Sequence, residues 1–181
     1  MDQVSISASQ FHALTTHNVK IVQPGEGINL WFFGILVTLK VLANETGNSY
    51  SLFEVTVPPG YGLPKHIRTQ EDENYYMLDG ELIWIVGDQE FYATKGSFAH
   101  LPRFVPHTFK NKTNRTAYML CSCQPGGFEK YLLEFGKMQS ASDYMPSEYT
   151  DNEIDLAYKM AEEYGILFVG HQENTDNTLS A

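Results

Sequence analysis

The fold is decided by residues 60–81, which read GYGLPKHIRTQEDENYYMLDGE, together with residues 96–111, which read GSFAHLPRFVPHTFKN. The first stretch carries His66 and Glu73 on either side of a short turn, and the second carries His107 much later in the chain. Imidazole and carboxylate groups suit Fe, Mn, Ni, Cu and Zn ions. A metal ion would require these side chains to converge from separate strands, which is possible only in a sheet that curls.

Short apolar or alternating segments surround these stretches and are separated by turn residues. The pairs Asp79-Gly80 and Gly87-Asp88 both favour two-residue hairpin turns. The strands predicted in this way are residues 30–43, 50–57, 74–78, 82–86, 90–93, 97–101, 108–111 and 117–123. Their number and spacing predict an all-β antiparallel sandwich or small barrel over residues 29–123.

The apolar period changes from two residues to the helical value after residue 124. Phe128, Tyr131, Leu132 and Phe135 recur at helical spacing. A second helix is predicted over residues 152–164, where Thr150 and Glu153 form a capping box and Gly165 ends the helix. We expect both helices to pack on the outside of the β domain. The predicted organisation is an N-terminal arm (1–27), a β-barrel (28–124), a helical appendage (125–171) and a flexible tail (172–181).

Composition excludes several classes of partner. The 181 residues contain 12 Lys and Arg against 22 Asp and Glu, a net charge of −10. Such a surface repels phosphate groups, so nucleic acid and anionic membranes are not expected partners. No run of 18 apolar residues and no signal-peptide pattern is present, so we expect a soluble cytoplasmic protein. Cys121 and Cys123 are then expected to be small core or pocket-wall residues, not a disulfide.

The two quoted stretches resemble the two motifs of the cupin superfamily. In the first motif, Gly60, His66, Glu73 and Gly80 have the family spacing, but Arg68 stands where the family has a second His. The second motif is matched by Gly96, Pro102, His107 and Asn111, with Phe104 in place of a Gly. Residues 31–34 (WFFG), 51–54 (SLFE), 125–129 (PGGFE) and 164–166 (YGI) are similar to a subgroup of compact microbial cupins described as quercetin 2,3-dioxygenase-like. The resemblance covers residues 28–170 and implies an antiparallel jelly-roll barrel with His66, Glu73 and His107 as metal ligands.

Arg68 is the departure that matters most for a metal site. Two His and one carboxylate still match the ligand set of non-haem Fe(II) facial-triad sites. A guanidinium in the same cavity would instead repel a dication by about 8 kcal/mol at 4 Å and an effective dielectric constant near 20. It could pair with Glu73 as a bidentate fork. The sequence therefore leaves open whether Fe, Mn, Ni, Cu or Zn is bound or no metal at all.

Other polar residues near the motifs have two interpretations. His100 is either a replacement ligand or a hydrogen-bonded residue of the pocket wall. Glu71 and Asp72 are expected to form a solvated turn. Three more histidines, His12, His17 and His171, are expected on the surface.

Strand parity predicts what lines the pocket. If Glu73 points inward, Tyr75 and Met77 do so too, and Phe109 follows His107 in the same way. Trp84 and Cys121 or Cys123 would complete an aromatic wall suited to a planar small molecule. The same residues would also be expected in an ordinary barrel core.

Three functions follow from these features. The first is a metal-dependent dioxygenase of an aromatic or enolic compound, in which Glu73 is both ligand and base and Arg68 neutralises an anionic substrate. The second is a metal-free binding module or sensor in which Arg68 replaces a ligand. The third is an isomerase or epimerase. A homodimer is expected through the N-terminal segment or an edge strand, because exposed strand edges need covering.

Overall fold

The computed structural model of the chain describes residues 19–139 and 148–170. Most of the predicted N-terminal arm, the predicted tail, and His12, His17 and His171 lie outside the described residues.

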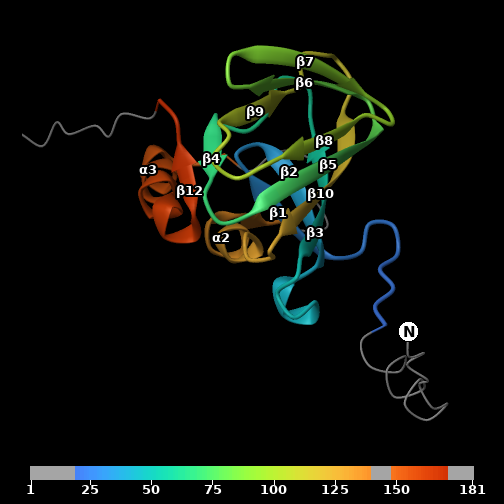
Figure 1. Cartoon of the computed structure of the whole chain (residues 1–181), viewed down its shortest axis with the longest axis vertical. Helices are drawn as coiled ribbons and strands as arrows, with labels where there is room; N and C mark the ends of the chain where they lie inside the picture. Colours follow the sequence, from blue (N-terminus) through green and yellow to red (C-terminus); the bar gives the residue numbers. More distant parts are fainter. Residues whose placement is uncertain (1–18, 140–147, 171–181) are drawn as a thin grey trace, which may run out of the picture.

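Two antiparallel sheets face each other around one hydrophobic core (Figure 1). The larger sheet has the order β11-β1-β2-β3-β10-β5-β8, and the smaller has the order β12-β4-β9-β6-β7. The strands of the larger sheet are β1 (Ile28–Phe32), β2 (Ile35–Val41), β3 (Ser51–Val57), β5 (Asp72–Asp79), β8 (Phe98–Leu101), β10 (Ala117–Gln124) and β11 (Lys137–Met138). Those of the smaller sheet are β4 (His66–Arg68), β6 (Glu81–Val86), β7 (Gln89–Thr94), β9 (His107–Lys110) and β12 (Ile166–Phe168). The prediction of an all-β jelly-roll barrel is confirmed.

Alternation along each strand determines which side chains enter the barrel. Strand β3 buries every second residue from Ser51 to Val57, and β10 does the same from Ala117 to Cys123. Because the two strands are paired in register, Cys123 lies opposite Ser51 and Cys121 opposite Phe53. The inner face is therefore a regular grid of apolar residues into which a few polar ones are set.

The helices cover one side of the barrel. They are α2 (Glu129–Phe135) and α3 (Asp151–Met160), with the short 3-10 helices η1 (Ala43–Glu45) and η2 (Ala161–Tyr164). Figure 1 shows α2 and α3 beside β1, β4 and β12, away from β6 and β7. Tyr131, Leu132 and Ala157 join the barrel core, and the predicted capping box of Thr150 and Glu153 is present. No helix in the described ranges is long and apolar enough to cross a membrane.

The predicted strand over residues 30–43 is wrong in one respect, because the chain turns back within it. Phe33 and Gly34 have φ values of 47° and 83°, and the turn they form separates β1 from β2. A Cβ at Gly34 would lie 2.0 Å from the ring of Tyr61, so the turn needs a glycine there. The continuous apolar run concealed this hairpin because both of its strands are buried.

Candidate metal centre and adjoining cavity

Three polar side chains meet inside the barrel, from both sheets. His66 on β4 and His107 on β9 are cross-strand partners, and Glu73 reaches them from β5 of the other sheet. The Nε2 atom of His107 lies 2.9 Å from Glu73 Oε2, and that of His66 lies 3.8 Å from the same oxygen. All three residues are buried, and one donor atom from each lies within 4.8 Å of the others. The sequence therefore predicted correctly that these residues converge.

The second nitrogen of each imidazole fixes its protonation. His66 Nδ1 lies 3.0 Å from the carbonyl oxygen of Pro64, and His107 Nδ1 lies 2.9 Å from that of Val105. A carbonyl oxygen only accepts, so each Nδ1 must donate its proton, and each neutral Nε2 then carries a lone pair. Both lone pairs face Glu73, which is also an acceptor. A proton on one imidazole or a metal ion would relieve the repulsion among these acceptors, and carbonyl contacts at Nδ1 are typical of metal-binding histidines.

The pKa shifts favour a charged Glu73 and a neutral His66. Burial alone would raise the pKa of Glu73, but hydrogen bonds to His107 and His66 and the charge of Arg68 hold it well below its usual value. Burial lowers the pKa of His66, against the opposing effect of its contact with Glu73. A carboxylate beside a neutral imidazole is the protonation state that metal ligation needs.

The expected pairing of Arg68 with Glu73 is wrong. Arg68 donates from Nη2 to Glu71 Oε2 at 2.9 Å, and its guanidinium lies 3.9 Å from the centre of the Phe128 ring. Arg68 and Glu71 are 1% and 3% exposed, so Glu71 is a buried counter-ion and not part of a solvated turn. Nε and Nη1 of Arg68 have no hydrogen-bond partner. The guanidinium is thus hydrogen-bonded to Glu71, while its charge also acts on the buried Glu73.

Neighbouring candidates lie farther from the three ligands. Asp72 is partly exposed and accepts from Arg103, but it is the first residue of β5 and not part of the expected turn. His100 is exposed on β8 and contacts Asn74 Oδ1 at 2.8 Å through Nδ1. It is one residue out of phase with buried Leu101, the cross-strand partner of Glu73, so it does not join the ligand group.

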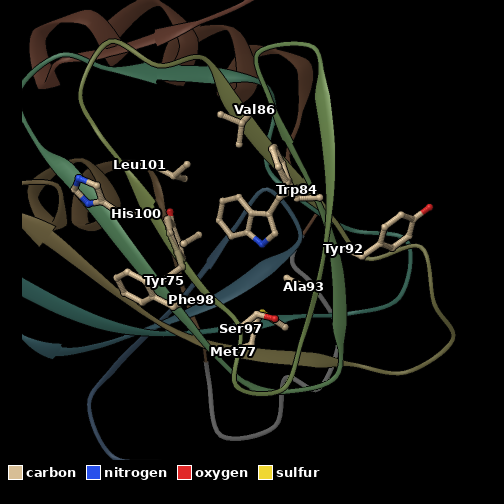
Figure 2. A pocket seen from close by; sticks show the side chains of 12 residues that line it. Tyr75, Met77, Trp84, Val86, Tyr92, Ala93, Ser97, Phe98, His100 and Leu101 are labelled. Atoms are coloured by element: carbon tan, nitrogen blue, oxygen red, sulfur yellow. The ribbon is translucent and has the colours of Figure 1, made fainter.

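A cavity of about 470 Å³ lies between β7 and β8, the last strands of the two sheets, and is also lined by β5 and β6. Tyr75, Met77, Trp84 and His100 were predicted for the pocket, and all four line this cavity. Figure 2 shows Trp84 at its centre, beside Tyr75 on β5. Phe109 lies behind that wall, with its ring 4.9 Å from that of Trp84. The cavity is also lined by Val86, Phe91, Tyr92, Ala93, Ser97, Phe98, Ala99 and Leu101.

Tyr75 connects the cavity to the three ligands. Its ring forms part of the cavity wall, and its hydroxyl donates to Glu73 Oε1 at 3.0 Å. Tyr75 is 4% exposed, so it separates the cavity from the buried ligands.

Two participants were missed at the sequence level. Glu71 follows Arg68 by three residues, but its role depends on a turn whose shape the sequence does not specify. Phe128 lies 60 positions from Arg68 in the chain. The only sequence signal for it was the PGGFE segment, residues 125–129, which resembles the cupin subgroup.

Comparison with known proteins supports the same family. A family model described as a cupin domain matches residues 53–123. Quercetin 2,3-dioxygenase of Bacillus subtilis (strain 168) is 23% identical over 96 residues, which cover 53% of this chain and 28% of that protein. An uncharacterised protein of Methanocaldococcus jannaschii is 30% identical over 79 residues, 44% of this chain and 63% of that one. The chain thus matches less than two thirds of the length of either relative.

A solved structure shares the fold at lower identity. The crystal structure of a predicted oxalate decarboxylase from Thermotoga maritima superposes with a TM-score of 0.55 and 18% identity, covering 58% of this chain and 98% of that one. Both comparisons agree with the two sequence motifs, the jelly-roll of two antiparallel sheets, and the group of His66, Glu73 and His107 inside it. Residues 53–123 match the cupin domain family, and the barrel that contains them has the cupin fold.

Proposed function

We propose that the protein binds a divalent first-row metal ion (Fe, Mn, Ni, Cu or Zn) through His66, Glu73 and His107. The observation that carries this proposal is the convergence of two imidazole nitrogens and a buried carboxylate within coordination distance of one another. Three ligands leave coordination positions open for a substrate and a second reactant.

The balance of buried charge supports a dication. Among the buried residues of the described chain, the carboxylates of Glu71, Glu73 and Glu129 oppose the single guanidinium of Arg68. With the carboxylates ionised and both imidazoles neutral, these groups have a net charge of −2. Uncompensated charge in a protein interior is costly, and a divalent ion would neutralise it.

The reaction we propose is the oxidation of a small aromatic or enolic compound, as in a quercetin 2,3-dioxygenase-like enzyme. The cavity of about 470 Å³ has an apolar wall rich in aromatic side chains that suits a planar molecule. The similarity to the Bacillus subtilis dioxygenase is consistent with this class. A bound first-row ion would supply Lewis-acid and redox chemistry between substrate and O₂.

The chain's own residues would position the substrate and move its proton. The rings of Trp84 and Tyr75 lie 4.7 Å apart, tilted by 59°, and form an aromatic wall against which a substrate ring can pack. Glu73 is hydrogen-bonded to the cavity residue Tyr75 and would accept a substrate hydroxyl proton through Oε1, where the Tyr75 hydroxyl now donates. Arg68 does not line the cavity, so we assign it no part in the reaction.

A metal-free binding module is the second candidate. The 2.9 Å contact between His107 Nε2 and Glu73 Oε2 is a hydrogen-bond distance, which a proton on His107 would also satisfy. In that case the cavity would bind its ligand without turnover.

Metal content measured by mass spectrometry, on protein purified without a histidine tag, separates the two candidates. Near-stoichiometric metal that is lost in His66→Ala and His107→Ala, but kept in the exposed control His100→Ala, would support the metal-dependent function. Metal-free protein that also refuses added Fe(II) would contradict it and leave the binding module.

Calorimetric titration with a flavonol in the absence of O₂ tests the ligand class. We expect binding that weakens in Trp84→Ala and is unchanged in His66→Ala if the cavity alone holds the ring. No heat of binding in the wild type would refute the flavonoid-like substrate.

We also expect a homodimer. The outer edges of β7 and β8 have no partner strand within the described ranges, and Phe91, Tyr92 and Phe98 on them are at least half exposed. Light scattering during size-exclusion chromatography would show a dimer that Tyr92→Lys weakens, and a monomer in the wild type would contradict the expectation.

A further inference from the structure

Two thiols lie beside the candidate metal centre, on the strand next to Glu73. In the pairing of β5 with β10, Cys123 is opposite Glu73 and Cys121 is opposite Tyr75. All four side chains are buried and point into the barrel. Neither the motif resemblance nor the proposed metal centre uses the two cysteines, which are both free.

The spacing of the donor atoms is close to that of a coordination site. The two Sγ atoms and a carboxylate oxygen of Glu73 all lie within 4.8 Å of one another, and Cys123 Sγ is 4.0 Å from Glu73 Oε1. Zn–S bonds of about 2.3 Å and Zn–O bonds of about 2.1 Å place tetrahedral ligands roughly 3.5 to 3.8 Å apart. Closing the group around an ion thus requires movements of about 1 Å or less, which cysteine χ1 rotation supplies.

The two oxygens of Glu73 are oriented toward different sets of donors. Oε2 faces His107 and His66, whereas Oε1 faces the Tyr75 hydroxyl and Cys123. One carboxylate can therefore bridge two ions, as carboxylates do in two-metal sites where the ions are about 3.5 to 4 Å apart.

An unpaired hydroxyl next to the thiols points to the same conclusion. Ser51 on β3 is the cross-strand partner of Cys123 on its other side, and its side chain is fully buried. Its Oγ has no hydrogen-bond partner. Leaving a buried hydroxyl unpaired is costly, and a thiolate formed at Cys123 would provide the acceptor that the neutral thiol provides only weakly.

We propose that Cys121, Cys123 and Glu73 Oε1 form a second metal subsite, which takes a thiophilic divalent ion such as Zn²⁺ or Cd²⁺. The ion forms bonds to two sulfurs and one oxygen, and the two thiol protons leave to solvent. Two positive charges replace two protons, so the buried charge is unchanged. Soft thiolate donors distinguish this subsite from the imidazole site, which shares Glu73 with it but is not needed for the thiols to bind.

Titration of the metal-free protein with Cd²⁺ tests the subsite directly. The chain has two cysteines, so a thiolate-to-cadmium charge-transfer band in the ultraviolet can come only from them. We expect the wild type to bind two Cd²⁺ ions and to develop this band. Cys121→Ser and Cys123→Ser should each bind one ion and lose most of the band, whereas the double variant His66→Ala/His107→Ala should bind one ion and keep the band.

The outcomes separate this proposal from the metal-dependent function. A wild type that binds one ion without a charge-transfer band, and loses that ion in the His variant, overturns the thiolate subsite and leaves the imidazole site intact. A band with one bound ion that the His variant does not affect supports the subsite and counts against the imidazole site. Circular dichroism verifies that each variant is folded, and if a Cys variant is not, the band and stoichiometry of the wild type decide alone.

Discussion

Replacing Glu71 by Gln tests the central feature of the interior, the buried pair that Glu71 forms with Arg68. The guanidinium is 1% exposed and has one hydrogen bond in the structure, to Glu71 at 2.9 Å. Glu71→Gln preserves the size of the side chain and one acceptor oxygen but removes the charge. Arg68 would then be a buried cation that keeps the face of Phe128, the amide oxygen at position 71 and the charge of Glu73 as its interactions.

The expected loss of stability follows from the burial of both partners. Removing one member of a buried ion pair costs about 3 to 5 kcal/mol, because the other charge remains desolvated and uncompensated. The retained amide oxygen and the cation–π contact favour the lower end, about 3 kcal/mol. Since domains are stable by about 5 to 15 kcal/mol, this is a large fraction. For a chain of this size it corresponds to a decrease in Tm of about 6 to 12 °C.

Urea unfolding of the metal-free protein, followed by circular dichroism, measures this loss. The matched control is Glu90→Gln, which breaks an exposed ion pair with Lys112. The side chain of Lys112 is 52% exposed and that of Glu90 is 49% exposed. Exposed pairs contribute about 0 to 1 kcal/mol, so this variant should be close to wild type. A second variant, Arg68→Met/Glu71→Leu, removes both charges and should recover most of the stability. Equal losses for Glu71→Gln and Glu90→Gln would refute the reasoning.

Three further predictions concern other parts of the chain. In metal-free protein, burial lowers the pKa of His66 below 6.5. The unfolded chain therefore binds a proton at this residue first as the pH falls. The stability that the neutral His66 contributes is complete above about pH 6.5 and is lost as the pH falls toward the pKa of the folded state. Urea unfolding at stepped pH should therefore show a weaker pH dependence in His66→Gln, and an unchanged slope would contradict this. Thr150→Ala removes the acceptor for the backbone N–H of Glu153 and should cost about 1 kcal/mol in the same assay, whereas no loss would mean that α3 does not depend on its cap. Gly62→Ala would place a Cβ 2.1 Å from the carbonyl oxygen of Phe109, so we expect a marked decrease in Tm, and a wild-type Tm would show that the two backbones are not in contact.

Most of the barrel could be predicted from local patterns, and the exceptions have physical causes. Alternation and the Asp79-Gly80 turn define β5 and β6 within a residue or two. The three-residue strands β4 and β12 are too short for a period of two to be visible, and they form because each pairs with a neighbour. The hairpin between β1 and β2 was missed because strands buried on both faces resemble one long apolar run.

The candidate site was predictable to the level of its ligands but not of their surroundings. The motif spacing placed His66, Glu73 and His107 together, because each position is fixed by a strand. Strand parity cannot choose between Glu71 and Glu73 as the partner of Arg68, since both are odd-numbered positions on the same side of one extended segment. The turn between β4 and β5 makes that choice, and its conformation depends on tertiary contacts.

The Arg68–Glu71 pair reduces the electrostatic cost of having an arginine at a metal-ligand position. A lone guanidinium 4 Å from a dication would oppose its binding by about 8 kcal/mol at an effective dielectric constant near 20. Glu71 is paired with that guanidinium at 2.9 Å, and its opposite charge reduces the repulsion. The two residues together act as a neutral unit, as the imidazole they replace would be, but they supply no lone pair to the ion. The substitution therefore removes one ligand without adding net charge, which leaves the two imidazoles and Glu73 as an open three-ligand site.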